Sequence, residues 1–283
     1  MRFRGVLRIF VCTLALALAL PGQNIAIHYD TVAADEINRR LANVKNTNTK
    51  REQELRALFE EVGCSGDHLA EQAVKHSRDP NVICALPGQT DSRIVVGGHF
   101  DFVDRGQGVV DNWSGCSLLP SLYQSLKNFP RRHTFVFVGF TDEEKGLVGS
   151  EFYVHQMSKQ EVAGISAMVN MDSLGTTPTK LDLTRGDKRP ADAFAAVAGS
   201  VQLPFSVMNV GRAGRSDSDS FQDRRVPAIT IHSMTNDTWP ILHSPRDQMS
   251  EIHQGDYYDT YRLIAAYLAY LDATLDVPGG AGN

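Results

Sequence analysis

The stretch "TFVFVGFTDEEKG", residues 134–146, runs from a strongly apolar segment into three consecutive acidic residues, Asp142, Glu143 and Glu144. The apolar part has the length and composition of a buried strand, so the acids fall where a strand should end and a turn should begin. On its own, such a turn fits a solvated loop beside a helix N-terminus, where free N–H groups stabilise negative charge. Whether it forms part of a site depends on what the other apolar runs carry.

Five more apolar runs have the length of buried strands, and helical patterns separate several of them. The runs are "NVICAL" (81–86), "RIVVGG" (93–98), "SAMVNM" (166–171), "KLDLT" (180–184) and "PAITIH" (227–232). The helical patterns cover residues 34–44, 50–62, 117–128, 148–157, 191–201 and 256–275. This alternation predicts an α/β fold, a single-domain three-layer sandwich in which helices flank a central, mostly parallel mixed sheet. Pro120 is expected in the first turn of its helix, where a missing N–H costs little.

The first 23 residues differ in character from the rest of the chain. A basic stretch, "MRFRGVLR", precedes an apolar run, "IFVCTLALALAL", which "PGQ" interrupts. The run is too short to span a bilayer comfortably and has the layout of a secretory signal peptide. We therefore expect residues 1–23 to be removed on export, which leaves a secreted or periplasmic domain, residues 24–283, with no membrane span.

The length and composition suit one large domain or two small ones, and the charge argues against a nucleic-acid partner. The chain has 283 residues, 42% of them hydrophobic, which suffices for a core that needs no additional cross-links. Loss of residues 1–23 removes three arginines and no acid, so the formal charge moves from −5 to −8. An acidic protein is a poor candidate for binding a polyanion.

Three cysteines remain once Cys12 leaves with the signal peptide. An oxidising compartment favours one disulfide and one leftover thiol. Cys64 and Cys84 lie on either side of a short segment expected to be helical and are the favoured pair, while Cys116 sits in an apolar stretch that indicates burial. Three buried thiols remain the alternative.

Four of the apolar runs end in an acid or an imidazole, the side chains that bind divalent metal ions in proteins. The residues at these ends are His99 with Asp101, Asp142 with Glu143 and Glu144, Asp172, and His232. The carboxyl ends of strands in an open α/β sheet gather along one edge, where ligands bind. Carboxylates packed together with imidazoles need a cation to offset their repulsion, so the acidic turn is expected to belong to a metal site.

Five motifs in order along the chain resemble the M28 family of dizinc exopeptidases. They are "GGHFD" (97–101), "DNWSG" (111–115), "DEEKGLVGS" (142–150), "NMDSLG" (170–175) and "HSPRD" (243–247). The resemblance implies two zinc ions, one held by His99, Asp172 and a bridging Asp111, the other by Asp111, Glu144 and His243. Two nitrogens and three carboxylates suit such a pair of zinc ions.

The resemblance assigns different work to the two remaining acids. Glu143 is expected to be the general base that takes a proton from the attacking water and returns it to the leaving amine. Asp101 is expected to reach the other ring nitrogen of His99 and fix its tautomer. The family resemblance also implies a cis peptide bond between Asp111 and Asn112.

Three positions bear on the choice of ligand or depart from the family pattern. His232 competes with His243 as the last ligand, and the "HSPRD" motif favours His243. Leu242 stands where many members have a tyrosine that supports the oxyanion. In "SDSDSF", residues 216–221, Ser218 replaces the usual histidine, and a helix cap is favoured there over a substrate contact.

Together these observations predict an exported zinc aminopeptidase, a monomer that acts on a peptide or a small aminoacyl substrate. A glutaminyl cyclase on the same scaffold, with one catalytic zinc, and a non-catalytic peptide-binding homologue remain alternatives. The sequence does not separate an aminopeptidase from a carboxypeptidase. A serine hydrolase is set aside, because the chain contains no Gly-x-Ser-x-Gly motif.

Overall fold

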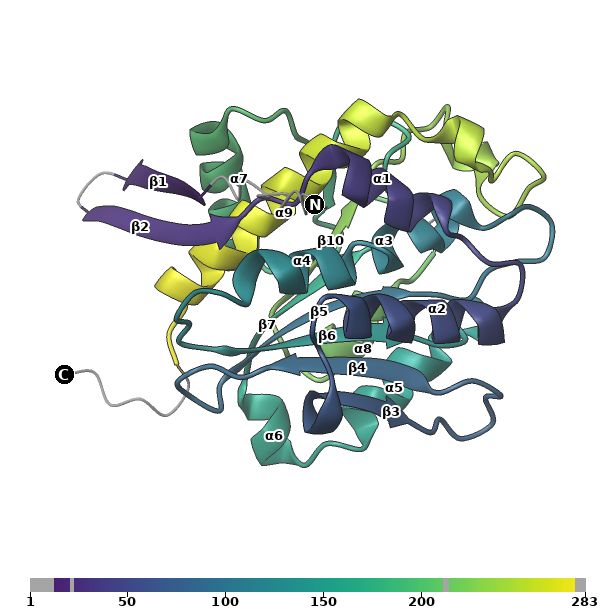
Figure 1. Ribbon diagram of the computed structural model, residues 1–283, viewed down its shortest axis with the longest axis horizontal. Helices are drawn as coiled ribbons and strands as arrows, with labels where there is room; N and C mark the ends of the chain where they lie inside the picture. Colours follow the sequence, from purple (N-terminus) through teal and green to yellow (C-terminus); the bar gives the residue numbers. More distant parts are fainter. Residues whose placement is uncertain (1–12, 21–22, 211–213, 278–283) are drawn as a thin grey trace, which may run out of the picture.

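A twisted sheet of eight strands lies at the centre of the computed structural model, which describes residues 13–20, 23–210 and 214–277 (Figure 1). In spatial order the strands are β3 (Leu69–Gln72), β4 (Asn81–Leu86), β6 (Thr134–Phe140), β5 (Arg93–His99), β7 (Ile165–Met171), β10 (Ala228–His232), β8 (Lys180–Asp182) and β9 (Ser206–Val207). The four central strands β6, β5, β7 and β10 run parallel, whereas β4 and β8 pair antiparallel with their inner neighbours. The prediction of a mixed, mostly parallel sheet is confirmed.

Helices cover both faces of this sheet. One face carries α1 (Ala34–Ala42), α2 (Asn48–Glu61), α4 (Leu119–Leu126), α7 (Lys188–Val201) and α9 (Gln254–Thr274), and the other α5 (Val148–His155), α6 (Lys159–Ala163) and α8 (Asp217–Gln222). Alternate residues of the strands supply the two cores: Ile94 and Val96 face the first set of helices, and Val95 faces the second. The three-layer sandwich expected from the sequence is therefore confirmed.

Short turns complete the structure and carry several residues of interest. They are Gly66–His68, Val109–Trp113, α3 (Ser114–Cys116), Glu143–Lys145, Trp239–Ile241 and Met249–Glu251. Pro120 lies in the first turn of α4, as predicted. The expectation of a short helical segment between Cys64 and Cys84 is wrong: only the turn Gly66–His68 is helical there, and the edge strand β3 follows it and pairs with β4. The edge strand β9 and the short helix α6 were not predicted, because they are short.

The N-terminal part of the described chain forms a separate two-stranded sheet. β1 (Thr13–Leu20) pairs antiparallel with β2 (Gln23–Asp30), and β2 packs on α4 and α9. Residues 1–12, 21 and 22 of the predicted signal peptide lie outside the described residues, and its removal stays a prediction. No helix within the described part of the chain is long and apolar enough to cross a bilayer.

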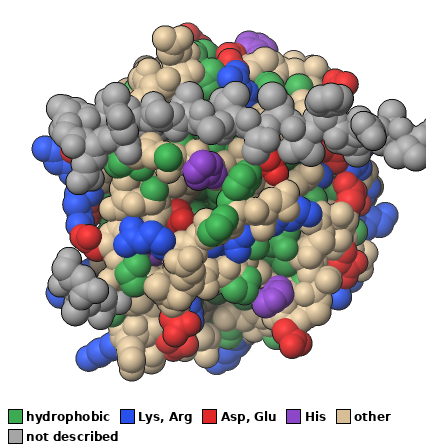
Figure 2. All heavy atoms as spheres, turned by 60° about the vertical axis from the view of Figure 1, so that its left-hand side comes forward, with side chains coloured by type: hydrophobic (Ala, Val, Ile, Leu, Met, Phe, Trp, Pro, Cys, Tyr) green, Lys and Arg blue, Asp and Glu red, His purple; other side chains and the backbone are tan. Residues whose placement is uncertain are grey.

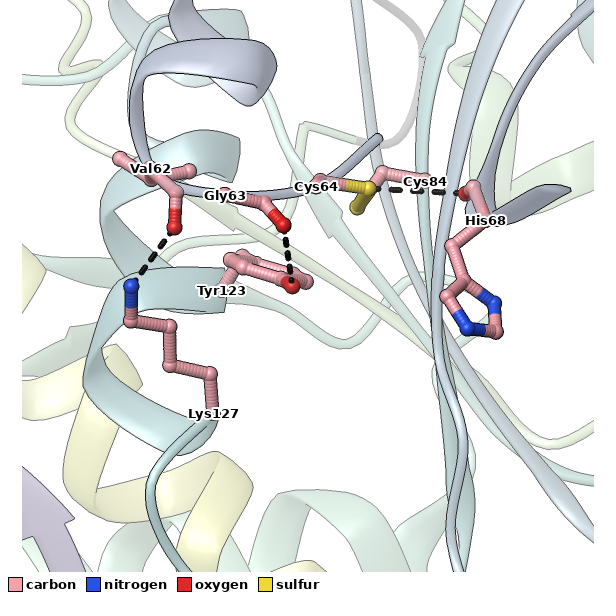
Figure 3. Close-up of a disulfide and its surroundings, with 7 residues drawn as sticks. All are labelled: Val62, Gly63, Cys64, His68, Cys84, Tyr123 and Lys127. Atoms are coloured by element: carbon pink, nitrogen blue, oxygen red, sulfur yellow. Dashed lines mark hydrogen bonds between the residues drawn. A yellow bond between two sulfur atoms is a disulfide. The ribbon is translucent and has the colours of Figure 1, made fainter. Parts of the chain in front are cut away.

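The predicted disulfide between Cys64 and Cys84 is present and ties the end of α2 to β4 (Figure 3). Two side chains at the C-terminal end of α4 also hold this connection. Lys127, which follows the last residue of the helix, donates its Nζ to the carbonyl oxygen of Val62 at 2.7 Å, and the Tyr123 hydroxyl donates to that of Gly63 at 3.4 Å. Cys116 is a buried free thiol, again as predicted.

On the face shown in Figure 2, acidic and basic side chains are interspersed.

Candidate metal centre

The acidic and imidazole side chains predicted from the strand ends meet at one edge of the sheet. β6, β5 and β7 are adjacent and parallel, so Glu143, His99 and Asp172, which lie at or just after their carboxyl ends, come together. Asp111 reaches the same place from the turn Val109–Trp113, and His243 from the segment that precedes α9. The site thus collects side chains from five separate segments.

Asp111 lies between the two histidines and presents a different oxygen to each. Its Oδ1 is 3.3 Å from His99 Nε2, and its Oδ2 is 3.1 Å from His243 Nε2. Glu144 Oε2 is 2.9 Å from His243 Nε2, on the second side. Asp172 Oδ1 is 3.7 Å from His99 Nε2, on the first. The carboxylate of Asp111 is therefore shared by two groups of potential ligands.

Glu143 lies on the side of His99, with its Oε2 3.9 Å from His99 Nε2. Two groups of three residues could each hold a metal ion, because the ligand atoms within each group all lie within 4.8 Å of one another. One group is His99, Glu143 and Asp172, and the other is His99, Asp111 and Glu144. All five residues expected to bind metal are brought together with Glu143, and Glu143 is also near enough to compete for the role of ligand. Its expected part as a base rather than a ligand stays a prediction.

Asp101 connects His99 to the acidic turn. Nδ1 of His99 is 3.2 Å from the backbone oxygen of Asp101 and 3.4 Å from its Oδ1, which favours a proton on Nδ1 and leaves Nε2 facing the carboxylates. The carboxylate of Asp101 also accepts the backbone N–H groups of Glu143 and Glu144, at 3.0 and 3.1 Å. The sequence suggested only the first of these two interactions.

The turn that carries Asp111 is held from the side of Asp172 by Asn112. Its Nδ2 donates to the carbonyl oxygen of Met171 at 2.8 Å, and its Oδ1 accepts the N–H of Ser173 at 3.1 Å. These two residues flank Asp172, so one amide fixes the spacing between two potential ligands. The peptide bond between Asp111 and Asn112 is cis, as predicted.

Asp247, the last residue of the "HSPRD" motif, holds the same turn from the other side. Its carboxylate accepts the N–H groups of Val110 at 2.7 Å and of Asp111 at 3.2 Å. Burial raises the pKa of Asp247 to about 6. Since His243 lies four residues earlier, this contact also connects the segments that supply Asp111 and His243.

The electrostatics of the cluster call for a cation. Burial, with further contributions from neighbouring carboxylates, raises the pKa of Glu143 to about 10 and that of Glu144 to about 8. Glu144 Oε1 is buried and has no hydrogen-bond partner among the described residues. Within the same part of the chain no lysine or arginine forms an ion pair with Asp111, Glu143, Glu144 or Asp172, and Lys145 instead pairs with Asp142 at 2.9 Å. A nitrogen and oxygen donor set of this kind fits zinc.

A cavity of about 340 Å³ opens beside the cluster, and five large apolar side chains form part of its lining. These are Leu147, Val210, Met234, Trp239 and Leu242. Leu242, the position where the family pattern has a tyrosine, is thus part of the cavity wall. No hydroxyl from this position is available to an oxyanion.

His232 also lines the cavity but is engaged by the backbone. Its Nδ1 accepts the N–H of Met234 at 3.1 Å, and its Nε2 donates to the carbonyl oxygen of Met208 at 3.0 Å. Burial lowers the pKa of His232, which keeps the ring neutral. With both nitrogens occupied, His232 has no free atom for a metal, whereas His243 faces Asp111 and Glu144.

The "SDSDSF" segment forms the start of α8. Ser216 is the N-cap, and its N–H donates to the carboxylate of Asp219 at 2.9 Å, so the favoured helix cap is confirmed. Ser218 is buried, and its hydroxyl lies 2.8 Å from that of Thr230. Asp217 is a residue that the sequence analysis missed: it is fully buried, and burial raises its pKa to about 7.

The sequence of this chain is similar to that of a peptidase family and of several known proteins. The model of peptidase family M28 matches residues 81–268. A probable leucine aminopeptidase 2 from Arthroderma benhamiae is 31% identical over 160 residues, which is 52% of this chain and 32% of that protein. Aminopeptidase YwaD from Bacillus subtilis is 26% identical over 181 residues, 61% of this chain and 40% of that protein. The chain therefore aligns with only about a third of the length of the fungal relative.

Two solved structures show the same fold. The LapA aminopeptidase of Legionella pneumophila superposes with a TM-score of 0.76 at 20% identity and covers 87% of this chain and 73% of that one. A glutaminyl cyclase from an Acidobacteriales bacterium superposes with a TM-score of 0.67 at 17% identity and covers 90% and 99%. At these sequence identities the structural similarity establishes the fold alone. The chemistry must be argued from the residues of the site.

Proposed function

We propose that this chain, which belongs to peptidase family M28, is an exported zinc aminopeptidase that removes N-terminal residues from peptides with the help of two zinc ions. The observation that carries the proposal is the position of Asp111, whose two oxygens face two different histidines. A carboxylate shared in this way is what a two-metal site requires. The proposed ligands are His99, Asp111 and Asp172 for one ion and Asp111, Glu144 and His243 for the other.

Bound zinc supplies a Lewis acid that polarises the scissile carbonyl and lowers the pKa of the attacking water. Side chains of the protein supply the proton transfer and the positioning. Glu143, which lines the cavity beside His99, accepts the proton of the attacking water and delivers it to the leaving amine. Asp101 fixes the position of the acidic turn relative to His99. Asn112 and Asp247 hold the turn that carries Asp111.

The cavity supports a preference for a large apolar N-terminal side chain. The cavity that contains the cluster, where the scissile bond would lie, is also lined by five large apolar side chains, Leu147, Val210, Met234, Trp239 and Leu242. Burial of an apolar side chain contributes about 1.5 to 3 kcal/mol, enough to select leucine or phenylalanine over a small residue. The fungal relatives that match this chain are named leucine aminopeptidases, in agreement with this preference.

Export is supported by two features of the chain. Residues 1–23 have the layout of a signal peptide, and the disulfide between Cys64 and Cys84 fits an oxidising compartment. We place the enzyme in the periplasm or outside the cell, as a monomer.

The test is a panel of aminoacyl chromogenic amides and N-terminally blocked peptides, assayed with zinc and with a chelator. Leucyl and phenylalanyl amides should be cleaved, blocked peptides should not, and chelation should abolish turnover until zinc is returned. Cleavage from the C-terminus would identify a carboxypeptidase. Cyclisation of N-terminal glutamine without hydrolysis would identify a glutaminyl cyclase, and absence of both reactions a non-catalytic homologue.

A further inference from the structure

Arg51, in the first turns of α2, is a fully buried cation that lies behind the site. Its side chain has 0% of its surface exposed, and it does not line the cavity. It forms no ion pair with a carboxylate of the described residues; the hydrogen bonds of its guanidinium go to backbone carbonyl oxygens. Burying a charge without a paired counter-ion is costly, and an apolar side chain of similar volume would often serve stability as well. Stability alone therefore does not explain why an arginine is buried at this position.

The guanidinium of Arg51 holds both ends of the loop between two proposed ligands. Nη1 donates to the carbonyl oxygen of Phe100, the residue after His99, at 3.2 Å. Nη1 also donates to that of Gly108 at 3.0 Å, and Nη2 donates to that of Gln107. Gly108 directly precedes the turn that carries Asp111. One rigid, planar group therefore fixes where the loop leaves His99 and where it enters the turn of Asp111.

Aromatic rings and a close backbone approach keep the guanidinium in this place. Its Cζ lies 4.0 Å from the ring centroid of Phe102 and 5.9 Å from that of Trp113, within range of cation–π attraction. Gly108 has φ +55°, and a Cβ there would come within 3.0 Å of Arg51 Nη2 and 2.3 Å of the Cβ of Phe102. The loop is thus built around the guanidinium, with no room for another side chain at position 108.

The charge of Arg51 also suits its surroundings. The carboxylates that favour its positive charge are those of Asp247, Asp101 and Asp111, all of which belong to the site or hold it in place. Burial lowers the pKa of Arg51 to about 10, so the guanidinium is still positively charged at neutral pH. A positive charge behind these groups offsets part of their mutual repulsion without occupying the cavity. A lysine would supply the charge but not the fork that binds carbonyl oxygens at both ends of the loop.

We infer that Arg51 is a positioning residue that sets the spacing of His99 and Asp111, and so the affinity of the site for the zinc ion these two residues share. This inference rests on the proposed function. It predicts that the loss of Arg51 weakens zinc binding by about 10- to 100-fold, the usual effect of removing a group that orients metal ligands. It further predicts a fall in kcat with KM nearly unchanged, because Arg51 does not contact the space in which the substrate lies.

The experiment compares Arg51→Met with a matched control, Arg40→Met, in the full chain. Arg40 is also buried, at 2% exposure, but its guanidinium contacts Ser121, Gln124 and Glu36, away from the loop. Zinc affinity is measured by competition with a chromophoric chelator, and the coordination is followed by the visible absorption of the cobalt(II)-substituted protein. Arg51→Met should lose zinc affinity and change the cobalt spectrum, while Arg40→Met should lose only thermal stability.

The possible outcomes separate this inference from the proposed function. Equal zinc affinity in wild type and Arg51→Met would overturn the inference and leave the proposed function standing. A wild type that binds no zinc would refute the proposed function and the inference with it. If Arg51→Met does not fold, Arg51→Lys against Arg40→Lys decides: at least a 5-fold loss of zinc affinity confined to Arg51→Lys would support the inference, and equal affinities would refute it.

Discussion

Replacing Glu143 with glutamine should separate proton transfer from metal binding in the acidic turn. The amide keeps the shape of the side chain, and the backbone N–H of residue 143 still donates to Asp101, so the turn should not move. An amide cannot accept the proton of the attacking water, and kcat should fall by about 10² to 10⁴, or about 3 to 5 kcal/mol in the barrier. Zinc content, measured by atomic emission on dialysed protein, should remain that of wild type.

The same substitution has a predictable effect on the metal-free protein. Burial raises the pKa of Glu143 from 4.5 to about 10, so at pH 7 this carboxyl is protonated when folded and ionised when unfolded. Metal-free wild type should therefore lose stability as the pH rises from 4.5 toward 10, and the glutamine variant should not lose this part. At pH 7 the variant should be more stable, on the order of 1 to 3 kcal/mol in urea unfolding.

Glu144→Gln is the matched comparison. Glu144 Oε2 lies 2.9 Å from His243 Nε2, so this change removes a charged ligand and should lower zinc occupancy before anything else. If Glu143→Gln loses a zinc ion while Glu144→Gln keeps both, the roles assigned to the two glutamates are reversed. If neither change affects hydrolysis, the acidic turn is a solvated loop and the mechanism is wrong.

Three further predictions concern metal content and stability. Wild type should contain close to two zinc ions per chain and Asp172→Ala about one; one ion in both proteins would favour the cyclase. Loss of the disulfide in the Cys64→Ala, Cys84→Ala double variant, which opens a sequence separation of 20 residues, should lower the free energy of unfolding by about 3 kcal/mol, and an unchanged denaturation midpoint would contradict this. Burial raises the pKa of Glu52 from 4.5 to about 7, so stability should fall as the pH rises between these values. Glu52→Gln should therefore be more stable than wild type at pH 8 by about 1 to 3 kcal/mol, an advantage that should vanish below pH 4.5.

The sheet and the cluster could be predicted from the sequence because one physical pattern determines both. Apolar runs of six or seven residues specify buried strands, and the residue that follows each run must lie at the edge where parallel strands end. This pattern predicts His99 and Asp172 as site residues from the sequence alone. Asp111 and His243, which lie on loops, required the resemblance to a family, since no periodicity marks them.

Other features could not be predicted, because they depend on tertiary contacts rather than on local pattern. The "SDSDSF" segment reads as a helix cap, and Ser216 does cap α8, but nothing in the run shows that Asp217 is fully buried. The contact of Asp247 with the turn of Asp111 joins residues 136 positions apart. Arg51 falls in a helical segment rich in charge, where an arginine is normally exposed.

The geometry of the acidic turn explains how two adjacent glutamates can have different partners. Asp142 adopts a left-handed conformation, φ +53°, which aspartate tolerates better than most residues and which turns the chain sharply after β6. The carboxylate of Asp101 then binds the N–H groups of Glu143 and Glu144 together, so neither peptide can rotate independently. With the backbone fixed, Oε2 of Glu143 lies on the side of His99 and Oε2 of Glu144 on the side of His243. Because Asp101 also contacts the ring of His99, one carboxylate sets the position of a proposed ligand and of the proposed base relative to each other.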